Sequence, residues 1–373
     1  PIFYFPKLSH PDPSVERRSG FLPPSISDTK NLGSSASIPY FFAINNEKNL
    51  TLTSRIFTQE NPLFLGEYQQ AFRYSTLFAD FGYTEGYNKT SATKKPGQKS
   101  HLFAKFLKNV KGENNSENNI EASFQDVSND KYLKLYKIES NLVDYNTDVL
   151  ENSIAFTRND EDFFFRLNAS VFETLKENYT DKYEYILPEL FLVKNLFNNN
   201  LGNLNLQSNL KVRNYDTNKV TKFLVNDFEW KSKDILSKNG VSSRILGQFK
   251  NVNYEANNVD LYKEELTNEA YGALGFLSEL KLQKDTNNSK HFLTPRILLR
   301  YAPGSMRKEE NGSKLDPIRA FNMNKLDNIN NFETGLSSSV GFNYKIKNEE
   351  KEFDFSVAQV ISEKENKQMS SES

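Results

Sequence analysis

The sequence predicts an all-β protein built around a large antiparallel sheet, the architecture of a transmembrane β-barrel. Apolar and polar residues alternate with a period of two along much of the 373-residue chain. The alternating stretches are long for a soluble sandwich, in which strands of about 5–6 residues are commonest. The chain contains 30 Phe and 18 Tyr but one Trp. Aromatic residues near strand ends are typical of the interfacial girdles of membrane barrels.

The opening of the chain contains three short apolar runs, at residues 2–5, 38–44 and 50–57. They are rich in aromatic and β-branched residues, which favour strands. Prolines interrupt this region at Pro6, Pro11, Pro13, Pro23, Pro24 and Pro39. Proline has no N–H to donate, so it occurs at sheet edges, strand starts or bulges. We therefore expect the first strands to pair with each other, or with the strand that closes the sheet, through a ladder that lacks hydrogen bonds. Ordinary loops are the alternative.

Alternation is clearest in the middle of the chain. Between residues 203 and 213, Leu204, Leu206, Leu210 and Val212 interleave with polar residues, which predicts a strand with one apolar and one polar face. Residues 163–172 and 336–347 show the same pattern. Further predicted strands cover residues 67–74, 77–83, 101–108, 120–127, 132–138, 149–157, 185–196, 220–231, 244–254, 271–283, 292–301 and 352–361.

The segments between these strands are of two kinds. Some are short, such as residues 159–161, and others are long and polar, such as residues 84–100 and 304–331. Outer-membrane barrels combine short periplasmic turns with long extracellular loops in this way. A soluble, glycan-binding β-sandwich would also alternate, so periodicity alone leaves both folds open.

Composition excludes several classes of protein. The mean hydropathy is −0.67 and the isoelectric point is about 6.5. No apolar run approaches the roughly 18 residues of a transmembrane helix. The net charge is −1, and the dispersed lysines form no basic stripe, so we expect no nucleic-acid partner. The chain has no cysteine and can form neither a disulfide nor a thiolate metal site.

No residues suggest catalysis. His10, His101 and His291 are the only histidines. They are far apart and lack acidic or histidine neighbours at metal-ligand spacing, so we expect them to be exposed or to face a lumen. The sequence contains no nucleophile elbow, P-loop or dinucleotide fingerprint. We predict no catalytic residue, metal or cofactor, and a protein that is not an enzyme.

Several segments carry a family resemblance. Near the start these are PIFYFP, PDPSVERRSGFLPP, IPYFFAI, NLTLTSR and EYQQAFR, and later VSNDKYLKLY, ILPEL and HFLTPRILLRYAP. In this order they resemble the LptD (OstA) family of lipopolysaccharide-assembly proteins. The resemblance implies that residues 1–18 are the end of a periplasmic β-jelly roll with a hinge. Residues 19–373 would be a partial outer-membrane barrel whose C-terminal strands are missing, and we expect the chain, which begins at Pro1, to be an internal fragment.

The resemblance also implies a lateral gate. Pro24 and Pro39 would lie on the first two barrel strands, with Pro23 as a neighbour that leaves the first position ambiguous. The missing hydrogen bonds would weaken closure of these strands against the last barrel strand. Each lost ladder bond removes about 0.5–1.5 kcal/mol of stability, so this seam could open while the rest of the wall holds. The alternative is that these are ordinary strand-start prolines.

The residues just before the barrel form a second candidate site. Arg17 and Arg18 could meet lipid A phosphates or the headgroup zone, and Gly20 could let the chain bend. A structural hinge is the favoured interpretation.

By resemblance, the protein would insert lipopolysaccharide into the outer leaflet of the bacterial outer membrane through its lumen and lateral gate. Its partners would be lipopolysaccharide, outer-membrane lipid, an LptE-like plug lipoprotein inside the barrel, and an LptA-like periplasmic bridge that docks on the jelly roll. The alternative function is that of a passive diffusion porin or another outer-membrane barrel, which should close without a weak seam.

Overall fold

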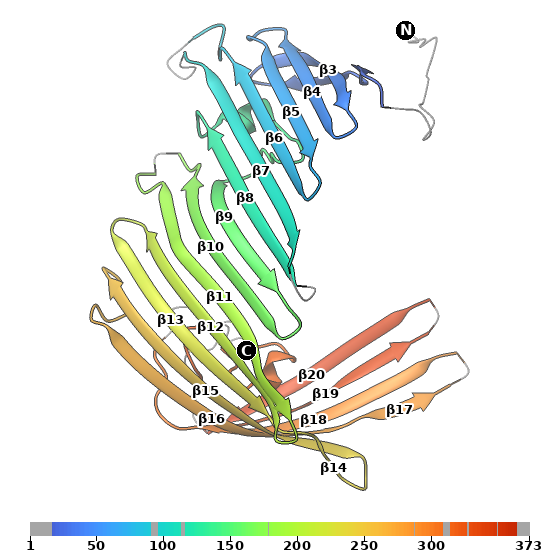
Figure 1. Cartoon of the computed structure of the whole chain (residues 1–373), viewed down its shortest axis with the longest axis vertical. Coiled ribbons are helices and arrows are strands. Elements are labelled where there is room, and N and C mark those ends of the chain that lie inside the picture. The colour runs from blue at the N-terminus through green and yellow to red at the C-terminus, as the bar shows by residue number, and fades with distance from the viewer. Residues whose placement is uncertain are drawn as a thin grey trace. The chain divides into compact units, whose positions relative to one another are not determined.

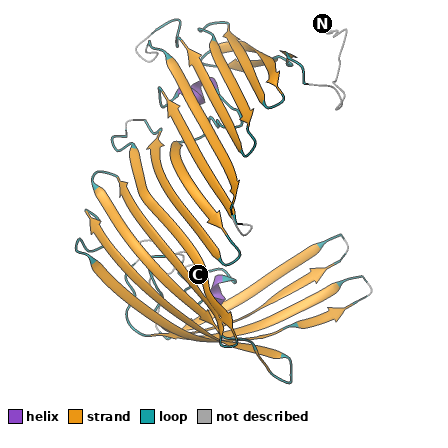
Figure 2. Ribbon diagram, viewed as in Figure 1, coloured by secondary structure: helices purple, strands orange, loops and turns teal. Residues whose placement is uncertain are grey.

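The structure, a computed structural model, describes residues 17–90, 96–112, 116–177, 179–286, 288–308, 314–326, 328–348 and 350–363. Twenty strands belong to one sheet, and Figures 1 and 2 show how fully strands dominate the chain. Among the described residues, two short helical elements interrupt them, α1 (Tyr132–Tyr136) and the 3₁₀ helix η2 (Arg319–Phe321). The predicted all-β fold is confirmed, and the antiparallel sheet is consistent with a fragment of a large β-barrel.

The strands follow one another along the chain. They are β1 (Gly20–Phe21), β2 (Ser25–Thr29), β3 (Gly33–Asn45), β4 (Lys48–Phe57), β5 (Leu63–Ala71), β6 (Ser75–Thr84), β7 (Lys99–Lys111), β8 (Glu117–Val127), β9 (Val149–Asn159), β10 (Phe163–Thr174), β11 (Tyr183–Asn199), β12 (Gly202–Tyr215), β13 (Lys219–Lys231), β14 (Ile235–Leu236), β15 (Val241–Asn257), β16 (Thr267–Leu280), β17 (Leu282–Asp285), β18 (Lys290–Ala302), β19 (Gly335–Lys347) and β20 (Glu352–Ser362).

In the part of the chain that the structure describes, no helix is long and apolar enough to cross a membrane.

The chain divides into two compact units. The first contains the described residues of Pro1–Gly112, Asn118–Phe156 and Ser170–Tyr183, and the second those of Glu113–Glu117, Thr157–Ala169 and Glu184–Ser373. Strands β9 and β10 contribute residues to both units.

One face of the first unit is apolar and exposed. The register of β4 to β7 aligns Ser54 with Phe64, Phe64 with Tyr83, and Phe81 with Leu102. Because side chains two residues apart share a face, Phe64, Phe81 and Leu102 lie on the same side. They are 52%, 41% and 45% exposed, so this face presents a broad apolar surface.

The other face of the first unit carries its core. Leu63 and Phe103 are buried there together with Tyr132, Leu133 and Tyr136 of α1. The sequence predicted a strand over residues 132–138, and this prediction is wrong. Tyr132, Leu133 and Tyr136 are the buried residues of α1, and their spacing of one and four positions suits one face of a helix.

The second unit repeats this two-faced arrangement. Strands β12 and β13 pair Leu206 with Phe228 and Leu210 with Leu224, which confirms the alternation predicted from Leu204 to Val212. Along β15, β16 and β18, the exposed apolar face continues through Phe249, Phe276 and Leu299.

Turn residues explain the tight connections in this unit. Asp216 and Asn218 adopt left-handed conformations between β12 and β13, which short polar side chains tolerate. Gly202 has a φ of +131°, and a Cβ there would lie 2.2 Å from the Lys231 carbonyl oxygen. Glycine is therefore required where β12 begins.

Candidate functional site

The first strand of the sheet is broken. Its two parts, β1 and β2, both pair with β3, with Phe21 opposite Tyr40 and Ser25 opposite Ser37. The three residues Leu22, Pro23 and Pro24 therefore lie opposite two residues of β3, Ile38 and Pro39. An extra residue on one strand is the mark of a β-bulge, which disrupts the ladder locally.

Pro39, on β3, removes a hydrogen bond from the ladder at the same position. The Leu22 N–H donates to the Pro39 carbonyl oxygen at 3.0 Å. A hydrogen-bonded antiparallel pair normally exchanges two such bonds, and Pro39 has no N–H to return the second. On its other side Pro39 lies opposite Thr53 of β4, so the missing donor concerns the first strand and leaves the β3–β4 ladder intact.

The structure thus brings together the three prolines predicted for the gate. Pro23 and Pro24 occupy the break between β1 and β2, and Pro39 lies across from it. We call the β1–β3 and β2–β3 ladder around Leu22 and Pro39 the proline seam. That this seam opens, and that the prolines weaken closure against the last barrel strand, both stay predictions.

The predicted hinge residues lie just before the proline seam. Arg17 and Arg18 are exposed. Gly20 is the first residue of β1, pairs with Phe41, and does not have a left-handed φ. The Ser19 hydroxyl accepts a hydrogen bond from the Ala43 N–H at 2.9 Å. Residues 1–16, most of the predicted jelly-roll segment, lie outside the described residues, and the hinge stays a prediction.

Behind the proline seam, the segment between β8 and β9 folds back onto the sheet. This segment, residues 129–148, includes α1 and is hereafter the inward segment. Arg55 of β4 connects it to β3: its Nη1 donates to the Tyr136 carbonyl oxygen at 2.5 Å and its Nε to the Ser37 hydroxyl at 3.1 Å. Tyr136 ends α1, where carbonyl groups lack helical partners. Ser37 lies two residues from Pro39, so one guanidinium joins the inward segment to the seam strand.

A second buried connection involves His101, which is 3% exposed. Its Nε2 lies 2.7 Å from Asp80 Oδ1 and its Nδ1 lies 3.2 Å from the Tyr132 hydroxyl. Gly82 lies opposite His101, and a Cβ there would approach the imidazole Cε1 to 2.5 Å. The glycine leaves room for the imidazole. The sequence did not indicate a hydrogen-bond partner for His101, because Asp80 comes close to it only through the β6–β7 register.

A second folded-back segment lies within the other unit, between β18 and β19. There the Arg300 guanidinium donates to backbone carbonyls of Met323 and Glu333. Lys325 Nζ lies 3.0 Å from Glu333 Oε2, and both side chains are at least 97% buried. Phe332 completes the adjoining apolar cluster. Burial lowers the pKa of Lys325, and the Glu333 carboxylate opposes this shift.

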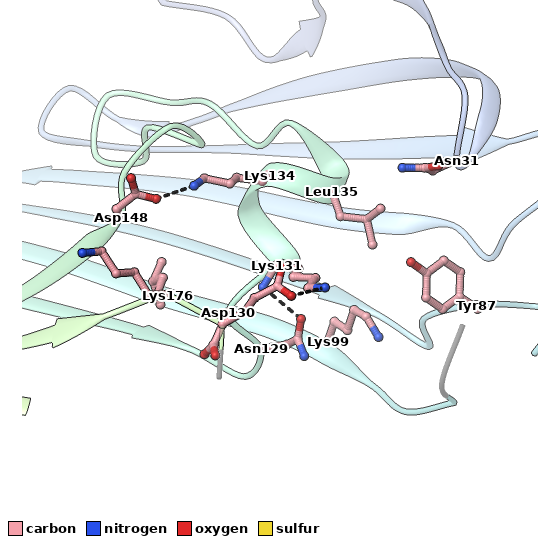
Figure 3. Close-up of a pocket in the computed structure, with 12 residues that line it drawn as sticks. Asn31, Tyr87, Lys99, Asn129, Asp130, Lys131, Lys134, Leu135, Asp148 and Lys176 are labelled. Atoms are coloured by element: carbon pink, nitrogen blue, oxygen red, sulfur yellow. Dashed lines mark hydrogen bonds and ion pairs between the residues drawn. The ribbon is translucent and has the colours of Figure 1, made fainter. Parts of the chain in front are cut away.

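A cavity of about 910 Å³ lies in the first unit beside α1 (Figure 3). Tyr87 and Lys99 lie on one side of the view, and Lys134, Asp148 and Lys176 lie on the other. The Lys134 ammonium donates to Asp148, and this hydrogen bond, with the nearby charges of Lys134 and Lys176, holds the pKa of the Asp148 carboxyl below its ordinary value. The cavity is polar and charged.

Among the residues that the structure describes, no group of three or more His, Cys, Asp or Glu side chains is arranged to hold a metal ion.

Comparison with known proteins gives one consistent result, although no family model matches the chain. The chain is 27% identical over 175 residues to an LPS-assembly protein LptD of Pseudomonas putida strain W619, covering 46% of the chain and 18% of that protein. A second P. putida LptD, from strain GB-1, is 25% identical over 195 residues, covering 52% of the chain and 20% of the relative. LptD of Methylococcus capsulatus is 39% identical over 69 residues, covering 18% and 7%. The matches span at most a fifth of these relatives' own lengths.

Proposed function

We infer from these partial matches that the chain belongs to the LptD family of LPS-assembly proteins. On that premise, we propose that it takes part in placing lipopolysaccharide in the outer leaflet of the bacterial outer membrane. Residues 19–373 form barrel wall, and residues 1–18 lead into it from a periplasmic domain. Lipopolysaccharide sugars pass along the lumen, and the lipid leaves sideways. LptE-like and LptA-like proteins are the proposed partners.

The proline seam is the observation that carries this proposal. A lipid can leave a barrel only where the wall parts, and parting exposes backbone polar groups to hydrocarbon at a cost of several kcal/mol each. The Leu22–Pro39 pair has one hydrogen bond in place of two, and Pro23 and Pro24 offer no donor. Fewer bonds therefore have to break at this pair than at a hydrogen-bonded pair without proline. The exposed arginines before β1, Arg17 and Arg18, are proposed to meet phosphates or headgroups.

Photo-crosslinking tests the route of the lipid. A crosslinking amino acid is placed at position 24 or 39 of the full-length protein, and at Asn205 of β12 as a control, in membranes that actively transport lipopolysaccharide. We expect transport-dependent lipid adducts at the two seam positions. If lipopolysaccharide crosslinks at no position while small solutes permeate freely, the protein is a porin and the proposal fails.

Restoring a backbone donor tests the physical cause. Pro39→Ala supplies an N–H that can bond the Leu22 carbonyl, which stabilises the closed seam by about 0.5–1.5 kcal/mol and reduces opening roughly 2- to 12-fold. Lipopolysaccharide should reach the surface more slowly by up to this factor. Pro295→Ala is the matched control, because Pro295 also lies within a strand, opposite Phe342 in the β18–β19 ladder. Equal rates for the two variants would contradict a role of the seam.

A further inference from the structure

We propose that the cavity beside α1 in the first unit binds a phosphorylated saccharide. The proposal goes beyond the route of the lipid and does not depend on the seam. Four lysines and three carboxylates line the cavity, together with Tyr87, Asn31 and Asn129. Lysines suit phosphate, amides and carboxylates suit sugar hydroxyls, and an aromatic ring suits the face of a sugar.

Two of the four lysines that line the cavity are in no ion pair with a carboxylate of the described residues. Lys131 pairs with Glu177 at 2.5 Å, Lys134 pairs with Asp148, and Lys182, just outside the lining, pairs with Asp130 at 2.7 Å. Among the described residues, no carboxylate lies within ion-pair distance of Lys99 or Lys176. The cavity therefore carries uncompensated positive charge, which favours an anionic ligand.

Lys99 is the more informative of these two cations. It is 8% exposed, yet among the described residues its ammonium has as partners only the Gly97 carbonyl oxygen at 3.5 Å and the Tyr87 ring at 5.1 Å. Burying an ammonium without an anion is costly. A phosphate in the cavity would supply the missing counter-charge, and Tyr87 would place the sugar ring beside it.

The other cationic groups can adapt to a ligand. The Lys131–Glu177 and Lys134–Asp148 side chains are all at least 50% exposed, and exposed ion pairs contribute little to stability. Exchange of either lysine from its carboxylate to a phosphate is therefore inexpensive. Lys176 is already exposed at the cavity and needs no such exchange.

Saturation-transfer NMR with glucose 1-phosphate tests the proposal on the full-length protein in detergent. We expect transfer to the sugar protons, with glucose giving little signal. Lys176→Gln, an exposed change that does not threaten folding, and Lys99→Met should each weaken binding by about tenfold, the loss of one charge-assisted hydrogen bond. Lys111→Gln, an exposed lysine at the far end of β7, is the matched control and should leave the signal unchanged.

Three results would overturn the site. They are equal signals for glucose and glucose 1-phosphate, an unchanged signal in Lys176→Gln, and displacement by inorganic phosphate as effective as by the sugar phosphate. A photo-crosslinker at Asn31 in active membranes then identifies the source of the ligand. Adducts with lipopolysaccharide assign a lipid-linked saccharide, and binding of the probe without such adducts assigns a free one. Positions 24 and 39 report on the seam separately, so the two proposals can fail independently.

Discussion

At the scale of single residues, buried polar groups determine how the inward segment is held. Tyr132 and Tyr136 pack on the sheet at 0% and 2% exposure. Burial disfavours the charged phenolate and raises the pKa of both hydroxyls, that of Tyr136 to about 12. Both tyrosines therefore stay neutral over a wider pH range when the segment is docked than when it is released.

This raised pKa predicts alkaline release of the inward segment. Below pH 10, the ordinary value for tyrosine, both states keep the proton of Tyr136, and this group makes no pH-dependent contribution to docking. Between about pH 10 and 12 the released segment binds fewer protons than the docked one, so docking weakens as the pH rises. Absorbance at 295 nm should show one tyrosinate near pH 12 that is missing in Tyr136→Phe. A difference spectrum centred near pH 10 would contradict the burial of this hydroxyl.

The residue scale also shows where sequence reasoning ends. Pro24 and Pro39 could be identified because proline changes the backbone by itself, wherever it lies. His101 could not be given its role, because its partner Asp80 lies 21 positions earlier on the neighbouring strand. The sequence does not specify the register that brings them together. Only once that register is known can Gly82 be recognised as the residue that leaves room for the imidazole.

At the scale of elements, period-two alternation was sufficient for most strands. Leu204, Leu206, Leu210 and Val212 lie on one face of β12 as predicted. Alternation failed for Tyr132–Tyr136, where five residues are too few to separate a period of two from one of 3.6. The broken first strand was also hard to foresee in detail, because a bulge is defined by pairing and not by composition.

The link between the inward segment and β3 predicts the effect of one substitution. Arg55→Ala removes the donors to the Tyr136 carbonyl and the Ser37 hydroxyl. Hydrogen bonds to charged groups contribute about 1.5–3 kcal/mol, so the segment should open at least tenfold more often. Trypsin should then cleave after the exposed Lys137 correspondingly faster, while the sheet remains folded.

Two variants sharpen this experiment. Arg158→Ala removes an exposed arginine that pairs with Asp160 at 2.8 Å and should leave the cleavage rate unchanged. Arg55→Lys retains the charge but lacks the forked donors needed to reach both acceptors, so an intermediate rate is expected. Cleavage of Arg55→Ala at the wild-type rate would show that the inward segment is held by its apolar contacts alone.

At the scale of the whole molecule, each unit has one exposed apolar face and one face covered by its own folded-back segment. Exposed apolar surfaces of this extent are unfavourable in water and mark contact with lipid or protein. The low mean hydropathy of −0.67 does not conflict with this, because the covered faces carry buried polar side chains such as Asp80 and Asp227 beside their apolar clusters, and the connecting segments are polar. Average composition could not reveal such a surface, whereas alternation combined with register does.

The apolar face predicts a position-dependent cost of inserting charge. Phe249 is 48% exposed, lies at the midpoint of β15, and is opposite Phe228 of β13. If this face contacts hydrocarbon, Phe249→Arg should destabilise the folded protein in lipid vesicles by about 2–4 kcal/mol, the cost of an arginine at the bilayer midplane. Asn200→Arg in the exposed β11–β12 turn should cost close to nothing. Urea titration followed by the gel mobility of folded and unfolded protein measures both variants. Equal costs would place this face against protein or water and would contradict a membrane-spanning sheet.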